Sequence, residues 1–420
     1  MATVELRVES IAAGGDGVAR TDGLVVFVPR SAPGDVGDAD VNVRKGSRFS
    51  RAELRTLRVA SPDRVEPVCS HYTRDRCGGC QLQHMSYTAQ LEAKSRIITD
   101  ALERLGRRTV SPIRVRPSAP QWKYRRKLTL ALRRRVTTAH GPRSEPAWIA
   151  GLHPFDDPVS VFALRECPIT NDSVTSVWRS ILRAESLLPA ARSMRGSVRL
   201  DENEMTFILE GGDAWPAFES FVSAVPEVNA VWWTPARGTR RRMTVARTSA
   251  HPGASFLQVN AAVAAELRDY VVERTMTYRP ERVIDAYSGI GDIASLLASA
   301  GVRVTAIELD PEATAWCAQR LPYGSSAVAG RVEGVLKDFV PADVILLNPP
   351  RTGIDPKVCE TLDGVRAVTR AIIYTSCNPA TLARDVARLP GFCIARVEAF
   401  DMFPQTAHVE TVCELVPRDV

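Results

Sequence analysis

The sequence lacks any long apolar segment. No stretch reaches the ~18 consecutive apolar residues that a membrane-spanning helix needs, and residues 1–7 show no basic region followed by an apolar one. Internal repeats and low-complexity tracts are also missing. These absences argue against a membrane protein, a secreted protein and a repeat protein, so we expect a cytoplasmic protein that does not contact membranes.

Cysteine is sparse, with nine residues in a chain of 420. So few cysteines, without a secretion signal, argue against a disulfide framework. Their spacing is more informative, because Cys69, Cys77 and Cys80 lie close together and a later Cys167 is followed by Pro168. Four thiolates that include a Cys-x-x-Cys pair suit either structural zinc or an iron-sulfur cluster, and spacing alone does not choose between them.

The net charge of +6 is distributed unevenly along the chain. Residues 1–145 hold 27 Lys and Arg against 15 Asp and Glu, a net charge of +12, and the remainder is therefore at −6. A basic N-terminal part joined to an acidic C-terminal part is typical of a polyanion-binding protein with a separate catalytic domain, since neutralisation of phosphates supplies much of the affinity for nucleic acids. An arginine-preferring proteome would give a similar excess, so charge alone leaves both interpretations open.

The length predicts more than one domain, because single cores usually stop growing beyond about 250 to 300 residues. Short alternating strands at 4–8, 24–28, 40–44 and 52–57, separated by Gly and Pro turns, predict an OB-like β-barrel over residues 1–60. A β-rich central domain is expected over 61–250, with a helix at 88–106 that we expect to pack on the catalytic domain at 251–420.

Strands and helices alternate in the C-terminal domain. Apolar strands are predicted at 282–286, 302–308, 344–347 and 371–374. This alternation predicts a parallel, doubly wound sheet, and therefore an α/β protein with a Rossmann-like domain that binds ligands beyond the carboxyl ends of its strands.

A glycine turn at 285–292 follows the first of these strands. Glycines there let the backbone approach a ligand closely. Glu308 ends the next strand, where a carboxylate can accept hydrogen bonds from both ribose hydroxyls of a nucleoside cofactor. Because the turn lacks the G-x-G-x-x-G pattern of dinucleotide sites, we predict S-adenosylmethionine as the ligand.

The loop Asn348-Pro349-Pro350-Arg351 follows the third strand, at an active-site edge of the sheet. Asn-Pro-Pro-aromatic loops occur in amino-methyltransferases, but here the fourth residue is an arginine. The loop alone is therefore compatible with an amino-methyltransferase or with an ordinary loop whose prolines have no catalytic role.

Cys377 follows the fourth strand, and Asn378-Pro379 comes next. Carbon 5 of uracil is a poor nucleophile, and a thiolate that adds to carbon 6 converts the ring to an enolate able to attack a methylsulfonium. The carbon 5 proton must then leave, and a carboxylate such as Glu410 could take it, with His408 as the competing base. A lone cysteine is more often a small buried hydrophobe, but its position at a strand end favours the nucleophile.

With these motifs the chain resembles the RNA uracil-C5-methyltransferases, particularly the iron-sulfur branch that methylates large-subunit ribosomal RNA. Residues 4–60 resemble the TRAM domain, an OB-like RNA-binding barrel. The resemblance implies that four cysteines ligate a [4Fe-4S] cluster, with zinc as the alternative: Cys69, Cys77, Cys80 and Cys167.

The same resemblance assigns roles in the catalytic domain. Residues 256–260 are similar to the family's Phe-x-Gln-x-Asn motif, which implies that Gln258 contacts the cofactor. The glycine turn, the end of the next strand and the Asn-Pro-Pro-Arg loop match further family motifs, which imply that Tyr287, Glu308 and Asn348 also contact the cofactor. Residues 376–385 resemble the nucleophile signature, which implies Cys377. Residues 401–410 resemble the final motif, which implies Glu410 as the base.

Two positions depart from the family pattern. Asn348 stands where the family loop has Asp, and Asp292 stands where its glycine turn commonly has Asn. Asn348 keeps a hydrogen-bonding carbonyl but loses a negative charge, and we carry no contact over to Asp292. The two exchanges suggest the hypothesis that charge has moved within one pocket.

The resemblance implies S-adenosylmethionine-dependent methylation of a uridine at carbon 5 in structured RNA, with 23S ribosomal RNA favoured and transfer RNA as an alternative. An amino-methyltransferase that uses Asn348 and a non-catalytic RNA-binding module are the rival functions. Phosphate contacts are expected from four basic residues of the central domain: Lys123, Arg125, Arg126 and Lys127. A monomer is the simplest expectation.

Overall fold

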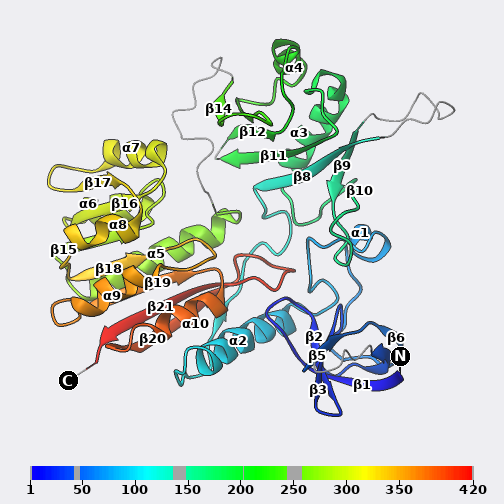
Figure 1. The fold of residues 1–420 in the computed structure, drawn as a ribbon, viewed down its shortest axis with the longest axis horizontal. Helices are drawn as coiled ribbons and strands as arrows, with labels where there is room; N and C mark the ends of the chain where they lie inside the picture. The colour runs from blue at the N-terminus through cyan, green and yellow to red at the C-terminus, as the bar shows by residue number, and fades with distance from the viewer. Residues whose placement is uncertain (1, 42–47, 136–147, 202, 244–257, 419–420) are drawn as a thin grey trace.

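The computed structural model describes residues 2–41, 48–135, 148–201, 203–243 and 258–418, which form three sheets (Figure 1). The first sheet has the order β5-β3-β2-β1-β4-β6. Its strands are β1 (Ala2–Ile11), β2 (Gly17–Thr21), β3 (Leu24–Val28), β4 (Val36–Val41), β5 (Phe49–Arg51) and β6 (Leu54–Val59). The sheet curls around a small core that includes Leu6, Val26 and Ala39. The strand expected at 40–44 is β4, which ends at Val41, and residues 42–44 lie outside the described part.

The central sheet has the order β10-β9-β8-β11-β12-β13-β14. Its strands are β8 (Lys127–Arg134), β9 (Trp148–Leu152), β10 (Phe162–Ala163), β11 (Ser193–Asp201), β12 (Glu204–Glu210), β13 (Ala230–Thr234) and β14 (Arg241–Arg242). One face packs an aromatic core that includes Trp178 and Phe207 against α3 (Asp172–Arg183), η1 (Glu185–Leu187) and α4 (Phe218–Ala224). On the other face, Lys127 pairs with Arg199 and Ala131 with Arg195, so basic side chains gather there.

The C-terminal sheet has the order β17-β16-β15-β18-β19-β21-β20-β7. Its strands are β7 (Val115–Arg116), β15 (Arg282–Ala286), β16 (Arg303–Glu308), β17 (Ser326–Ala329), β18 (Val344–Leu347), β19 (Ala371–Ser376), β20 (Phe392–Phe400) and β21 (Glu410–Pro417). β15 to β19 run parallel, whereas β21 is antiparallel to β19. The order reverses between β15 and β18, which is the switch point where such sheets bind ligands.

Helices cover both faces of this sheet. One face carries α5 (Ala261–Thr277), α6 (Asp292–Ser299) and α7 (Pro311–Arg320). The other carries α8 (Val332–Val335), η2 (Leu336–Asp338), α9 (Pro356–Gly364) and α10 (Pro379–Ala387). The structure thus confirms the predicted α/β class, and the observed strands lie at or next to the ranges expected from apolar runs.

Helix α2 (Tyr87–Arg104) comes from the segment before the central sheet, close behind α1 (Ser70–Arg74). It nevertheless packs beside α10, with Ile98 and Leu102 buried in the core of the C-terminal sheet (Figure 1). Strand β7 likewise joins the edge of that sheet by pairing with β20. Segments that precede the central sheet in the sequence and segments that follow it therefore both contribute to the C-terminal domain. In the described residues, no helix combines the length and the apolar character that crossing a membrane requires.

Candidate active site

Cys377 and Glu410 meet at the carboxyl edge of the C-terminal sheet. Ser376, the last residue of β19, pairs with Thr411, the second residue of β21. Cys377 follows Ser376 and Glu410 precedes Thr411, so the antiparallel pairing brings these two residues to the same place. After Cys377 the chain turns into α10, where the side chain of Asn378 accepts hydrogen bonds from two backbone amides at 3.1 and 3.4 Å. This cap starts the helix at once and leaves Cys377 at the turn.

Arg351 lies beside both groups. Burial raises the pKa of the Cys377 thiol, the nearby Glu410 carboxylate raises it further, and the Arg351 guanidinium lowers it by its charge and a hydrogen bond. Burial also raises the pKa of Glu410 to about 8, which a hydrogen bond from Gln258 and the charge of Arg351 partly oppose. A half-buried thiol, a buried carboxyl group with a pKa near neutrality and an exposed cation therefore share one corner.

Gln258 lies beside the candidate base. Its side chain hydrogen-bonds Glu410. Phe256 and Leu257, which begin the motif, lie outside the described residues, whereas Asn260 ends it as the N-cap of α5 and donates to the Ser118 hydroxyl at 2.9 Å. The motif thus brings Gln258 to the catalytic corner.

His408 is poorly suited to be the base. Desolvation lowers its pKa to about 4, and the positive charges of Arg351, Lys94 and Arg125 lower it further. A neutral imidazole with so low a pKa accepts a proton weakly, because base strength follows pKa. Glu410, with a pKa of about 8, is the stronger base of the two.

The glycine turn between β15 and α6 is tightly built. Gly291 has φ +79°, and a Cβ there would lie 2.1 Å from Cys317 Sγ, so only glycine fits. Glu308 accepts hydrogen bonds from Gly289 N at 2.9 Å and Asp310 N at 2.8 Å, which orient its carboxylate toward the turn. A carboxylate offers about four acceptor sites, so Glu308 retains capacity for a ligand.

Other side chains of this turn also bear on a cofactor. The buried Ser288 hydroxyl has no hydrogen-bond partner among the described residues, which fits a ligand that supplies one. Burial raises the pKa of Asp285 to about 7, and the neighbouring Glu308 and Asp292 add to this effect. Tyr287 has φ +64° and packs partly buried against the core on the α8 to α10 side.

Asn348 stands exposed at the carboxyl end of β18. Its backbone amide donates to Ala286 O at 3.3 Å, which ties this loop to the glycine turn. Asp292, the second departure from the family pattern, accepts a hydrogen bond from Arg320 at 2.9 Å. The extra carboxylate is therefore paired with a cation on α7.

The loop that begins at Asn348 is clamped to α10 through Asp385, which is fully buried. Asp385 accepts from Ile354 N at 3.0 Å and from Tyr374 Oη at 2.8 Å, and Arg384 binds its other oxygen at 2.7 Å. Arg384 also donates to Thr352 O at 2.7 Å. These bonds join the loop of Arg351 to the helix that starts after Cys377.

The four cysteines of the N-terminal half gather in one place. Three of them are buried, namely Cys69, Cys77 and Cys80, and Cys167 is half-buried. A charge on Cys167 raises the pKa of each of the three buried thiols, which shows that the four side chains are near one another. Burial is the main cause that raises the pKa of Cys77 to about 11. Four thiols fit a soft metal centre by donor type, yet in the described residues no three His, Cys, Asp or Glu side chains are arranged around a single ion.

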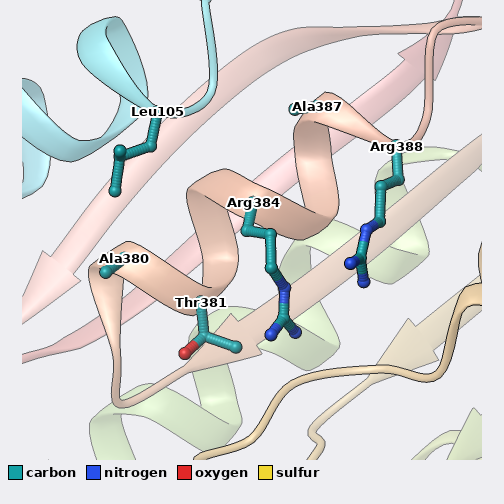
Figure 2. Close-up of a pocket in the computed structure, with 6 residues that line it drawn as sticks. All are labelled: Leu105, Ala380, Thr381, Arg384, Ala387 and Arg388. Carbon is teal, nitrogen blue, oxygen red and sulfur yellow. The ribbon is translucent and has the colours of Figure 1, made fainter.

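An open pocket on the outside of α10 is separate from this chemistry. Figure 2 shows the residues that line it, which are Leu105 after α2, Arg388 after α10, and the α10 residues Ala380, Thr381, Arg384 and Ala387. None of the predicted site residues lines it.

Sequence reasoning missed some of the residues that build the site. In the sequence, Arg351 stands out only as a departure from an aromatic, although an arginine beside a candidate thiolate is a recognisable signal. Ser288 offers no signal, because the burial of one hydroxyl is a tertiary property. The role of Asp385 is likewise hidden within a longer motif.

The parallel sheet, its switch point and the reactive groups at its carboxyl edge define the fold of an S-adenosylmethionine-dependent methyltransferase. Residues 328–417 match the profile of the tRNA (Uracil-5-)-methyltransferase family, and residues 2–52 match the TRAM domain. An uncharacterised RNA methyltransferase of Halalkalibacterium halodurans is 31% identical over 98% of this chain and 96% of its own. One of Protochlamydia amoebophila is 29% identical over 98% and 97%.

The chain therefore belongs to the RNA uracil-5-methyltransferase family, which confirms the predicted enzyme class and TRAM domain. A solved structure of the same fold is the tRNA (uracil-54, C5)-methyltransferase of Pyrococcus abyssi in complex with S-adenosyl-L-homocysteine. It has a TM-score of 0.70 at 22% identity, over 98% of this chain and 99% of that one. The monomeric state and the cytoplasmic location stay predictions.

Proposed function

We propose that this enzyme methylates carbon 5 of a uridine in structured RNA, with Cys377 as nucleophile and Glu410 as general base. The observation that carries the proposal is the meeting of Cys377, Glu410 and Arg351 at one corner of the sheet edge, with Glu410 buried. The pairing suits a reaction that needs a thiolate first and a carboxylate later.

The steps follow from the chemistry of uracil. Cys377 Sγ adds to carbon 6, and Arg351 stabilises the thiolate before it adds. When bound, S-adenosylmethionine supplies the methyl group that carbon 5 takes. Glu410 then removes the carbon 5 proton, the double bond between carbons 5 and 6 reforms, and Cys377 leaves as a thiolate. The uridine must be unpaired or flipped out, because carbon 6 is not accessible to a thiolate within a base stack.

The cofactor is expected in the glycine turn. Glu308 would bind the ribose hydroxyls, and Ser288, Tyr287 and Asn348 stand near enough in the fold to line the same site. Gln258 contacts Glu410, so we assign it to the boundary between cofactor and base. The hypothesis that charge has moved from position 348 to position 292 is weakened by the pairing of Asp292 with Arg320.

We propose that the three domains have the roles and boundaries that the sequence predicts. Residues 1–60 and 61–250 bind RNA, and residues 251–420 carry out the transfer. Large-subunit ribosomal RNA is the favoured substrate because the four gathered cysteines resemble those of that branch. Transfer RNA is the alternative, since the solved relative acts on a tRNA uracil.

We also propose that Cys69, Cys77, Cys80 and Cys167 hold a [4Fe-4S] cluster, with zinc as the alternative. Support comes from the gathering of four thiols from two distant segments. The methyl transfer needs no electron, so the cluster would hold the fold together. Iron, sulfide and zinc content of protein purified without oxygen, with all four cysteines replaced by serine as control, distinguishes the two metals.

The function is tested by incubating the enzyme with ribosomal or transfer RNA and labelled S-adenosylmethionine. We expect label in 5-methyluridine, its loss in Cys377→Ala, and a denaturation-resistant enzyme–RNA adduct in Glu410→Gln, because without the base the sulfur cannot be eliminated. Label in adenine or cytosine, or activity that survives in Cys377→Ala, would assign an amino-methyltransferase. RNA binding without any transfer would assign a non-catalytic module.

A further inference from the structure

The segment before Glu410 is held by a distant part of the chain. We call residues 401–409 the base loop, because they lead directly to Glu410, and residues 81–94 the frame. The frame follows Cys80 and includes the first half of α2. About 310 residues of chain separate a frame residue from its partner in the base loop, as the pair Gln90 and Gln405 shows.

Two pairs of side chains fasten the base loop to the frame. Lys94 Nζ lies 2.5 Å from Asp401 Oδ1 and 3.1 Å from Phe403 O, and Tyr87 Oη donates to Asp401 Oδ2 at 2.8 Å. Lys94 and Asp401 are both fully buried. A buried ion pair gains little net stability over apolar packing, but it fixes geometry because each charge must keep its partner.

The second fastener is a reciprocal amide pair. Gln90 Nε2 donates to Gln405 Oε1 and Gln90 Oε1 accepts from Gln405 N, each at 3.0 Å. The amides of Gln81 and Leu82 donate to Gln405 O at 3.2 and 3.0 Å. Gln405 has φ +70°, a left-handed conformation that non-glycine residues rarely adopt and that persists only where neighbours impose it. The frame therefore dictates the backbone shape of the base loop.

The frame can act on the base because of where Glu410 stands. It is the first residue of β21, where it pairs with Phe400 at the end of β20 while Thr411 pairs with Ser376, so the sheet fixes the chain from Glu410 toward its C-terminal side. On the other side the chain is the base loop. Ala407 packs into a small buried cluster with Leu82 and other frame residues, which extends the contact to three positions before Glu410.

We propose that residues 81–94 are the positioning frame of the general base, with Lys94 and Gln90 holding the base loop so that Glu410 stands across from Cys377. This inference rests on the proposed role of Glu410. Neither Lys94 nor Gln90 touches the reacting atoms, so both are positioning residues. Because the base acts only after methyl transfer, a misplaced Glu410 slows elimination of the sulfur and leaves the earlier addition intact.

The test compares Lys94→Met and Gln90→Met with Glu410→Gln and the native enzyme. In both frame variants we expect kcat to fall about tenfold or more, KM for RNA and for cofactor to stay within about twofold, and the enzyme–RNA adduct to accumulate as in Glu410→Gln. Arg274→Met is the matched control. It breaks the pair between Arg274 of α5 and the buried Glu414, 2.8 Å away on the strand that begins with Glu410, and should cost stability without trapping the adduct.

Adding Asp401→Asn to Lys94→Met separates positioning from stability. The double variant removes the unpaired buried carboxylate, so stability should recover while kcat stays low. If kcat recovers together with stability, the frame is merely structural and the proposal fails. Native turnover without adduct in folded Gln90→Met and Lys94→Met, beside a trapped adduct in Glu410→Gln, also overturns it. If Glu410→Gln itself forms no adduct, the base assignment fails and this inference falls with it.

Discussion

Glu410 and Cys377 make the reaction depend on pH in a definite direction. Burial raises the pKa of Glu410 to about 8 and also raises that of Cys377. Both groups must be deprotonated to act, and both are mostly protonated below their raised pKa. We therefore expect kcat to rise with pH through about 8, measured with RNA and cofactor both in excess. A glutamate with its reference pKa of about 4 would be fully deprotonated from pH 6 to 9 and would give a flat rate there. A flat rate over this range would therefore contradict the raised pKa of the base.

Arg351 sets where that rise occurs. Its positive charge lowers the pKa of both Cys377 and Glu410. Arg351→Met keeps much of the side-chain volume and removes the charge, so the rise should move to higher pH. Arg384→Met, on the same clamp but paired with Asp385, is the control that should leave the profile in place. An unchanged profile in Arg351→Met would show that its charge does not reach the reacting groups.

At the scale of elements, Asp385 holds the loop after β18 against α10. Its removal in Asp385→Ala leaves Ile354 N and Tyr374 Oη without their buried acceptor. We expect unfolding in urea to become easier by about 2 to 3 kcal/mol, and cofactor affinity to weaken because Asn348 and Arg351 lie on the released loop. Asp385→Asn keeps an acceptor and should lose less. Equal losses in the two variants would mean that the charge of Asp385, rather than its hydrogen bonds, holds the loop.

At the scale of the whole molecule, the face of the central sheet opposite α3 and α4 is expected to meet the RNA backbone. Lys127 and Arg195 lie on that face. Burial lowers the pKa of Lys127, and the positive charges of Arg199, Arg195 and Arg125 lower it further, so several cations lie near one another there. Arg125 in turn is near His408, at the catalytic corner.

Replacing Lys127 and Arg195 together by serine should weaken RNA binding for all sequences. The slope of log affinity against log salt should become shallower by up to about 0.9 for each RNA phosphate that the protein no longer neutralises, measured by titration at several salt concentrations. Arg282→Ser with Arg303→Ser removes the same charge from the amino edge of the C-terminal sheet and is the control. If both pairs change the slope equally, only the total charge matters, and the central face has no special role.

The sequence by itself determined much of this protein. Apolar runs and glycine turns predicted the strands of the C-terminal sheet, because period and turn chemistry are local properties. The residue types at the strand ends, above all Cys377, Glu308 and Glu410, predicted the chemistry, since parallel strands bring their carboxyl ends to one edge.

The tertiary structure decided the rest. Only the pairing of β19 with β21 places Glu410 across from Cys377, and only burial raises its pKa above that of His408. The contact between the frame and the base loop could not be predicted from the sequence, because Lys94 and Asp401 are about 300 residues apart in the chain. Local patterns report which side chains are available, whereas contacts between distant segments and the desolvation they impose arise only when the chain is packed.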